Sequence, residues 1–165
     1  MGEAFPWKQH ILHCLESTQY MSLSTADSEL GTWVNPVYFA WDKAFNLYFV
    51  SMPHSRHMTN MRTDPRVSIA IYSTAQDTLG DVEGIQLHGK AEFVTEEHEV
   101  ELAYNIYYAR VYPETRKGID SVAADYRGDS AEWVFVKIIP EEIFYFNTEF
   151  FGHERQLVPV DQLSV

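Results

Sequence analysis

The feature that most constrains the fold is residues 47–72, which read LYFVSMPHSRHMTNMRTDPRVSIAIY. The apolar run at 47–51 predicts a strand, and a Pro-His turn follows it. A short helix is then expected from Ser55, and Pro65 marks its end because proline cannot continue a helix. The apolar run at 66–72 predicts a second strand, so we expect the chain to be organised around a strand, a helix start and a strand.

The helix start at Ser55 carries groups that suit an anion. Ser55 is a favoured N-cap residue, and the first turn behind it contains Arg56 and His57. Backbone N–H groups, a hydroxyl and one or two cations therefore converge there, which favours a phosphate. The alternative is an ordinary capped helix with solvated charges, in which Met58 and Met61 pack on the core.

The order of these segments resembles a known family. A strand, Ser-Arg followed by a basic residue, about one helical turn, then Asp-Pro-Arg-Val-Ser and an apolar strand is similar to the FMN-binding split β-barrel family related to pyridoxamine 5'-phosphate oxidase. The resemblance extends more weakly from Tyr20 to about Gln156. It implies that Ser55, Arg56 and His57 hold the flavin phosphate. The family commonly has lysine where this chain has His57, and a histidine is only partly charged at neutral pH.

The resemblance also implies cofactor contacts along the strands. The family strand that matches residues 32–41 lies along the flavin and often supplies basic residues, but Val34 and Phe39 stand near those positions here. This departure removes positive charge from the proposed site, and Asn35 is the polar contact expected instead. Another family strand often carries a Gly-x-Ala unit, here Gly-Lys-Ala, and the polar flavin contact before it maps to Gln86.

Near the C-terminal end, the resemblance implies an aromatic residue that reaches the flavin across a dimer interface and a basic residue beyond it. Phe146 and Arg155 match these two, and a core aromatic and a surface cation remain the alternative interpretations. The cofactor-binding residues expected in total are Asn35, Pro36, Val37, Phe49, Val50, Ser51, Ser55, Arg56, His57, Gln86, Phe146 and Arg155.

Length and composition set the class of protein. With 165 residues, 45% hydrophobic and 15% aromatic, the chain is expected to form a single domain, residues 1–165, with a packed core. The net charge of −12 argues against nucleic acid or an acidic membrane surface as a partner, because such binding depends on cations that neutralise phosphates. Cys14 is the only cysteine, which excludes an intramolecular disulfide and a cysteine-based zinc site. No apolar run resembles a signal peptide or a membrane span, so a cytoplasmic protein is expected.

The N-terminal segment predicts a helix at residues 6–16. His10 and His13 lie three residues apart on it, a spacing that suits a metal, but no carboxylate or third ligand lies nearby in the sequence. We interpret them as surface residues and expect no metal site. Cys14 is interpreted as a small buried hydrophobe.

Most of the remaining chain alternates strands with turns. The expected strands are residues 20–25, 32–41, 47–51, 66–72, 85–94, 132–139 and 143–147. The first three should form an antiparallel meander through turns at 26–31 and 42–46, and residues 73–83 are polar and turn-like. Pro36 cannot donate to a strand ladder, which predicts an edge, a bulge or a close ligand approach. Pro140 is expected to stop one strand before a tight turn into its partner.

A helix is expected after Thr95, with a wide apolar stripe that includes Tyr104, Tyr107 and Tyr108. A stripe of this spacing is interpreted as core rather than as a cofactor site. Residues 114–129 are charged and irregular, and the sequence leaves open whether they form a short helix or a mobile flap.

These patterns favour a mainly β fold with α insertions (α+β), a closed antiparallel split β-barrel of about six strands with flanking helices. The chain lacks the sequence motifs of phosphate-binding loops, zinc proteases, α/β-hydrolases and Rossmann folds. The resemblance implies an FMN-dependent oxidoreductase, a homodimer that holds FMN between its subunits and acts on an unidentified small-molecule substrate. The alternatives are a split barrel that uses a deazaflavin or haem, and a non-enzymatic binder that has lost the phosphate clamp.

Overall fold

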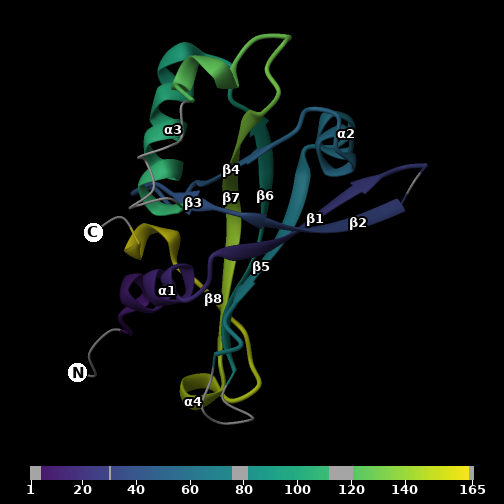
Figure 1. The fold of residues 1–165 in the computed structure, drawn as a ribbon. Coiled ribbons are helices and arrows are strands. Elements are labelled where there is room, and N and C mark those ends of the chain that lie inside the picture. Colours follow the sequence, from purple (N-terminus) through teal and green to yellow (C-terminus); the bar gives the residue numbers. More distant parts are fainter. Residues whose placement is uncertain (1–4, 30, 76–81, 112–120, 164–165) are drawn as a thin grey trace.

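The computed structural model describes residues 5–29, 31–75, 82–111 and 121–163. It shows one antiparallel eight-stranded sheet curled into a half-barrel, with helices on both sides (Figure 1). The strands are β1 Tyr20–Asp27, β2 Gly31–Tyr38, β3 Ala40–Trp41, β4 Leu47–Ser51, β5 Arg66–Tyr72, β6 Glu83–Phe93, β7 Val134–Asn147 and β8 Gln156–Leu157. The helices are α1 Trp7–Glu16, α2 Arg56–Thr63, α3 Glu97–Val111 and α4 Thr148–Phe151, with 3-10 turns η1 Ala123–Tyr126 and η2 Val160–Gln162.

The strands follow the spatial order β2-β1-β5-β6-β7-β4-β3, and β8 pairs with β7. This confirms the antiparallel split barrel with flanking helices that the sequence predicts. The ladder formed by the described strands has two ends, β2 and β3, so the barrel is curled rather than hydrogen-bonded all the way round. The segment expected as one strand at 32–41 is interrupted at Phe39, which separates β2 from β3. Pro36 lies in the edge strand β2, as predicted.

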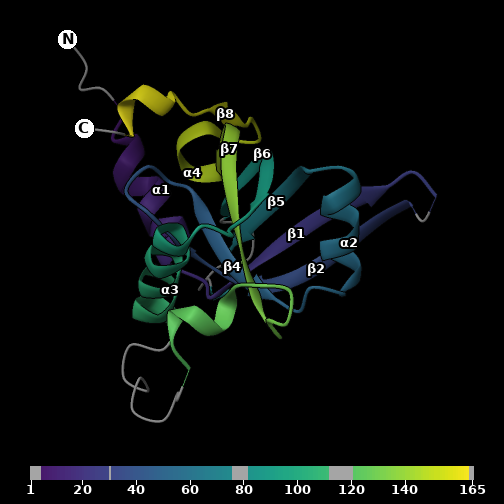
Figure 2. The ribbon, with the colours of Figure 1, turned by 90° about the horizontal axis from the view of Figure 1, so that it is seen from above.

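Two apolar clusters lie on the two faces of the sheet. Inside the half-barrel, Phe49 of β4 and Val136 of β7 belong to the larger cluster, which also buries one side of α1 and of α2. On the outer face, Tyr48 and Phe135 of the same two strands pack under α3 (Figure 2). β4 is therefore covered on both faces, which explains why it reads as a continuous apolar run. On β1, β5 and β6 the outward side chains are mostly polar and partly or fully exposed.

The prediction of two strands separated at Pro140 is wrong, because β7 continues through this proline as a single strand. His88 of β6 pairs with Glu142 and Gly89 pairs with Pro140, so Glu141 is an extra residue that forms a β-bulge. A bulge tolerates proline because the ladder is already interrupted there. A Cβ on Gly89 would lie 2.2 Å from the backbone oxygen of Ile139, so the close approach of the two strands requires glycine.

The other turns and connections follow the expected plan in part. The Asp42 carboxylate organises the turn between β3 and β4 by accepting bonds from the backbone N–H of Ala44 and of Asn46. Of the segment left open at 114–129, residues 123–126 form η1, while 112–120 lie outside the described residues. Residues 76–81 of the expected polar turn also lie outside them. None of the helices within the described ranges is long and apolar enough to cross a membrane.

Candidate functional site

A groove along the free edge of β2 collects five of the twelve predicted site residues. Its volume is about 450 Å³, and we name it the tyrosine groove. Its lining consists of Tyr20, Asn35, Pro36, Val37, Tyr38, Val50, Ser51, Tyr107, Tyr108, Tyr126 and Trp133. None of these described lining residues carries a formal charge.

Five of the predicted cofactor residues line this groove, namely Asn35, Pro36, Val37, Val50 and Ser51. They come from β2 and β4, which are separated in sequence and meet because the sheet curls. β2 is one end of the described ladder, so one side of its backbone has no strand partner there. A ligand in the groove therefore meets backbone donors and acceptors as well as side chains.

Three polar side chains, which we name the polar trio, connect the groove to the N-terminus of α2. Ser55 occupies the N-cap position, as predicted, but its side chain makes no capping hydrogen bond. Instead its Oγ lies 3.3 Å from Ser51 Oγ and 3.3 Å from His57 Nε2. Ser51 Oγ and His57 Nε2 are 2.8 Å apart. Two hydroxyl groups are thus held together between the groove and the first turn of α2.

His57 is a buried residue and not an exposed cation. Its exposed fraction is 5%, and it lies among the core residues of α2. Burial lowers the pKa of His57 below its ordinary value of 6.5, so the imidazole is neutral at neutral pH. Its role at the helix start is to position Ser51 and Ser55. The sequence left open whether the helix start carries one cation or two, and the buried His57 does not supply the second because the helix turns this side chain inward.

Arg56 is the cation that the start of α2 contributes. Its guanidinium carbon lies 4.5 Å from the ring centroid of Trp33 on β2, and the side chain is half-buried. This stacking joins the first turn of α2 to the groove strand two residues before Asn35. Phe49, another predicted contact, lies instead in the inner core, with its ring centroid 6.1 Å from that of His57.

The two strand positions where the family often has bases offer none here. Val34 is 61% exposed and points to the outer face of the sheet. Phe39 is completely buried, and the guanidinium of Arg110 lies 4.4 Å from its ring centroid. A basic side chain at position 39 would be repelled by the guanidinium of Arg110, which already packs against this position. This explains why the chain has an aromatic residue there.

The remaining predicted residues lie on the outer face of the sheet, away from the tyrosine groove. Arg155 Nη1 donates to Gln86 Oε1 at 2.7 Å, and both line a second groove of about 380 Å³, which we name the outer groove. Ser22, Ser24 and Ser68 line it too. Phe146 is half-buried on β7, paired with Gly84 of the neighbouring strand. One protomer therefore does not bring these three predicted residues to the tyrosine groove.

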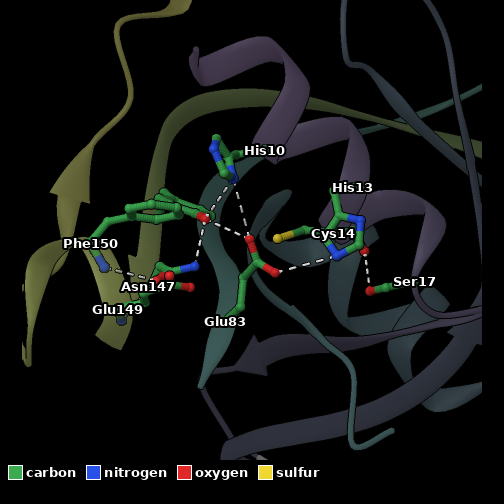
Figure 3. A network of polar contacts seen from close by, with 9 residues as sticks. His10, His13, Cys14, Ser17, Glu83, Asn147, Glu149 and Phe150 are labelled. Atoms are coloured by element: carbon green, nitrogen blue, oxygen red, sulfur yellow. Dashed lines mark hydrogen bonds and ion pairs between the residues drawn. The ribbon is translucent and has the colours of Figure 1, made fainter. Parts of the chain in front are cut away.

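His10 and His13 have a carboxylate neighbour that the sequence did not reveal. Glu83 lies between them, with its oxygens 3.7 Å from His10 Nδ1 and 3.5 Å from His13 Nε2 (Figure 3). The hydroxyl of Tyr145 donates to Glu83 at 2.5 Å, and Asn147 donates to Tyr145. The two imidazoles approach different oxygens, and no group of three metal-ligating side chains is found within the described residues. The network ties α1 to β6 and β7.

Sequence reasoning missed one wall of the tyrosine groove. Tyr107 and Tyr108 belong to the core under α3, as predicted, but they also line the groove with Tyr126 and Trp133. The hydroxyls of Tyr108 and Tyr126 are hydrogen-bonded to each other. The available signal was the hydroxyl itself, because a buried tyrosine needs a polar partner and a stripe of leucines would not.

Comparison with known proteins decides the family. The sequence model described as Pyridoxamine 5'-phosphate oxidase matches residues 7–147. The chain belongs to this family. The resemblance drawn from the segments around Ser55 is thereby confirmed, and the curled half-barrel is the split barrel of the pyridoxamine 5'-phosphate oxidase family. A comparison with curated proteins finds no match.

Solved structures show the same fold at low sequence identity. A haem-binding protein from Mycobacterium smegmatis is 19% identical with a TM-score of 0.69, and the match covers 99% of this chain and 62% of that protein. The haem storage protein HutZ from Vibrio cholerae is 17% identical with a TM-score of 0.63, over 84% of this chain and 93% of that one. An FAD-binding protein from Mesorhizobium loti is 21% identical with a TM-score of 0.60, over 82% and 90%. At such identities the likeness concerns the fold.

Proposed function

We propose that this protein is an FMN-dependent oxidoreductase that acts on a small molecule. The flavin phosphate binds at the start of α2, and the ring lies in the tyrosine groove against β2 and β4. The observation that carries the proposal is the convergence of Asn35, Pro36, Val37, Val50 and Ser51 on one groove beside the α2 N-terminus. FMN would supply the electron or hydride transfer, and the protein residues would bind, orient and shield it.

The residues present fit a phosphate without a second cation. Ser51 and Ser55 have hydroxyls that can donate, and neutral His57 holds both in place. The first turn of α2 offers backbone N–H groups that no N-cap side chain occupies. Arg56 supplies charge and, through its planar guanidinium, a two-point hydrogen bond to phosphate oxygens.

Haem is the second candidate, since two of the similar structures are of haem proteins. The described lining of the tyrosine groove contains no histidine, cysteine or methionine to bind the iron. Burial and the bond to Tyr126 raise the pKa of Tyr108, which disfavours the phenolate that a tyrosine ligand requires. The groove therefore favours a flavin. The absorbance spectrum of the purified protein separates flavin, deazaflavin, haem and a cofactor-free binder.

The proposal includes a homodimer. Gln86, Phe146 and Arg155 lie on the outer face, so in one protomer they are remote from the groove that holds the other predicted contacts. A two-fold pairing through the exposed face of β1, β5 and β6 would let one protomer present these residues to the cofactor of its partner. The outer groove on this face combines three serines with apolar side chains such as Ala70 and Phe144, a mixture that suits an interface.

Substitution of Arg56 tests the phosphate site. Arg56→Ala is expected to cost about 1.5 to 3 kcal/mol of FMN affinity, roughly tenfold or more, because a charge-assisted contact is lost. Arg56→Lys should recover only part of it, since lysine lacks the planar fork. Riboflavin, which has no phosphate, should bind wild type and Arg56→Ala about equally. Fluorescence titration of both flavins measures these affinities.

The matched control is Arg66→Ala, which removes an exposed arginine paired with Asp64 at 2.6 Å outside the site. It should leave FMN affinity unchanged. Equal FMN affinity of the wild type and Arg56→Ala would show that the phosphate does not bind at the start of α2, and the cofactor-free binder would then be the better description.

A further inference from the structure

The tyrosine groove has two walls of different chemistry. β2 and β4 form the wall to which the proposed function assigns the cofactor. The other wall comes from α3, from η1 and from the residue before β7. These segments supply Tyr107, Tyr108, Tyr126 and Trp133. We name these four residues the aromatic wall. Figure 1 shows α3 at the upper left and α2 at the upper right, with β7 between them.

The aromatic wall is held by contacts of its own and does not depend on a ligand. The rings of Tyr107 and Tyr108 are 5.4 Å apart at their centroids, and Tyr126 lies 4.9 Å from Phe135 in the core beneath. Tyr104 donates to the backbone oxygen of Ser121 at 2.7 Å, which fixes the segment before η1. A rigid aromatic surface of this kind binds planar conjugated molecules well, because little side-chain freedom is lost on binding.

The charge of the groove restricts what enters it. No formally charged side chain is found among the described residues that line it, in a chain of net charge −12. A phosphate or carboxylate moved into the groove would lose its hydration and gain no cation in exchange. Arg56 is assigned to the cofactor phosphate and stacks on Trp33 outside the lining. The second ligand of the groove must therefore be uncharged.

The hydroxyls of Tyr108 and Tyr126 give the wall a polar point. Each phenol has one O–H, and the bond between the two oxygens uses one of these two protons. The hydroxyl of Tyr126 also lies 3.2 Å from Ser121 Oγ, where either oxygen can be the donor. A ligand acceptor can replace this contact. Burial raises the pKa of Tyr108, so the pair remains a hydrogen-bond donor throughout the neutral pH range.

We propose that the aromatic wall is the substrate subsite, and that it takes an uncharged, planar, conjugated carbonyl compound rather than a phosphorylated one. The assignment rests on the proposed function, which places the flavin against the other wall. The proposed substrate differs from the phosphorylated compound named in the family description. A substrate phosphate would have no cationic partner in the described lining of the groove. The hydroxyl pair orients the substrate by donating to its carbonyl oxygen.

The test compares two probes that differ by one charge. Binding of 1,4-naphthoquinone and of 1,4-naphthoquinone-2-sulfonate to the FMN-loaded protein is measured by equilibrium dialysis. We expect the neutral quinone to bind at least tenfold more tightly than the sulfonate. Cys14 is buried and its pKa is raised to about 12 by burial and by Glu83, so addition of the quinone to this thiol does not compete. Equal or tighter binding of the sulfonate overturns the proposal.

Two variants locate the carbonyl contact. Tyr108→Phe and Tyr126→Phe keep the rings and remove one hydroxyl each. Each should lower the affinity for 1,4-naphthoquinone about three- to tenfold. Binding of naphthalene, which has no carbonyl, should stay unchanged in both. The control is Tyr72→Phe, which alters an exposed tyrosine on β5 outside the groove. Loss of quinone and naphthalene binding together, or no effect on either, contradicts the assigned role of the hydroxyl pair.

FMN titration of the same variants keeps the two proposals distinguishable. If FMN binds but the sulfonate and the neutral quinone bind with equal affinity, the proposed substrate class is wrong and the proposed function stands. If FMN fails to bind, the proposed function falls, and selectivity for the neutral quinone in the cofactor-free protein still supports the chemistry of the groove.

Discussion

The polar trio at the start of α2 shows how a single buried residue changes the chemistry of a site. His57 resembles a phosphate ligand in the sequence, yet its ring is buried and lies 2.8 Å from Ser51 Oγ. A protonated imidazole there would be a buried charge, which burial disfavours. The neutral ring instead acts as a fixed partner for two hydroxyls, Ser51 and Ser55. In the proposed site, phosphate affinity would depend on hydroxyls, backbone N–H groups and Arg56, and not on a second cation.

This interpretation predicts a pH-dependent stability. The pKa of His57 is lowered in the folded protein, whereas in the unfolded chain it is close to 6.5. Between the lowered value and 6.5 the unfolded chain binds a proton that the folded protein excludes, so this contribution is present above pH 6.5 and is lost as the pH falls. His57→Gln, which cannot titrate, should show a smaller decrease in the free energy of unfolding between pH 7.5 and pH 5.5. Urea denaturation at the two pH values measures it.

The same substitution should lower stability at pH 7.5 by about 1 to 3 kcal/mol, because buried Ser51 keeps at best a poorer partner. His98→Gln is the control, since His98 is an exposed residue of α3. An unchanged pH slope in His57→Gln would mean that other groups cause the acid sensitivity.

At the scale of elements, Arg110 of α3 connects segments that lie far from it in the sequence. Its guanidinium donates to the backbone oxygens of Leu15 and Thr18, each at 2.6 Å, and to that of Phe39. It also stacks 4.4 Å from the ring of Trp41. These acceptors belong to the end of α1, to the connection before β1 and to the break between β2 and β3. One cation therefore fixes α3 against the connection that leads into β1 and against the break that follows β2.

Arg110→Met should keep the length of the side chain and lose all three hydrogen bonds to backbone carbonyls, leaving half-buried oxygens unsatisfied. We expect a loss of about 2 to 4 kcal/mol in the free energy of unfolding, measured by urea denaturation. Arg127→Met removes an exposed arginine paired with Glu97 at 3.0 Å, and as a control it should cost less than about 1 kcal/mol. Similar losses in the two variants would refute the connecting role of Arg110.

At the scale of the whole molecule, the sequence predicts elements well where pattern and local chemistry agree. The apolar alternation of β1, the edge position of Pro36 and the start of α2 after Ser55 all follow from local rules. The strand pairing around Gly89 does not follow from local rules. The bulge that lets β7 continue through Pro140 arises from the pairing of two strands far apart in the sequence. Local rules treat proline as a stop, and tertiary pairing overrides them.

The site shows the same division. Five predicted contacts meet in one groove because β2 and β4 carry them on the strands that the pattern identifies. Glu83 between His10 and His13 was missed because the three residues meet only when α1 packs near β6. The aromatic wall was missed because Tyr108 and Tyr126 reach the groove from separate segments. Contacts that the family resemblance supplies are therefore predictable, and contacts between distant segments on which the resemblance is silent are not.

In the proposed homodimer, the predicted contacts Gln86, Phe146 and Arg155 would meet the groove of the partner protomer across the subunit boundary. We expect the wild type to sediment as a dimer at micromolar concentration, at twice the 19.1 kDa chain mass. Ala70→Arg adds a charge within the outer groove and should give monomers whose FMN affinity is at least tenfold lower, since charged groups are costly at the centre of an interface. Ala44→Arg adds the same charge in the exposed turn before β4, and as a control it should remain a dimer with normal affinity. A wild type that sediments as a single 19.1 kDa species, or a monomeric Ala70→Arg that binds FMN normally, would place the whole cofactor site within one protomer.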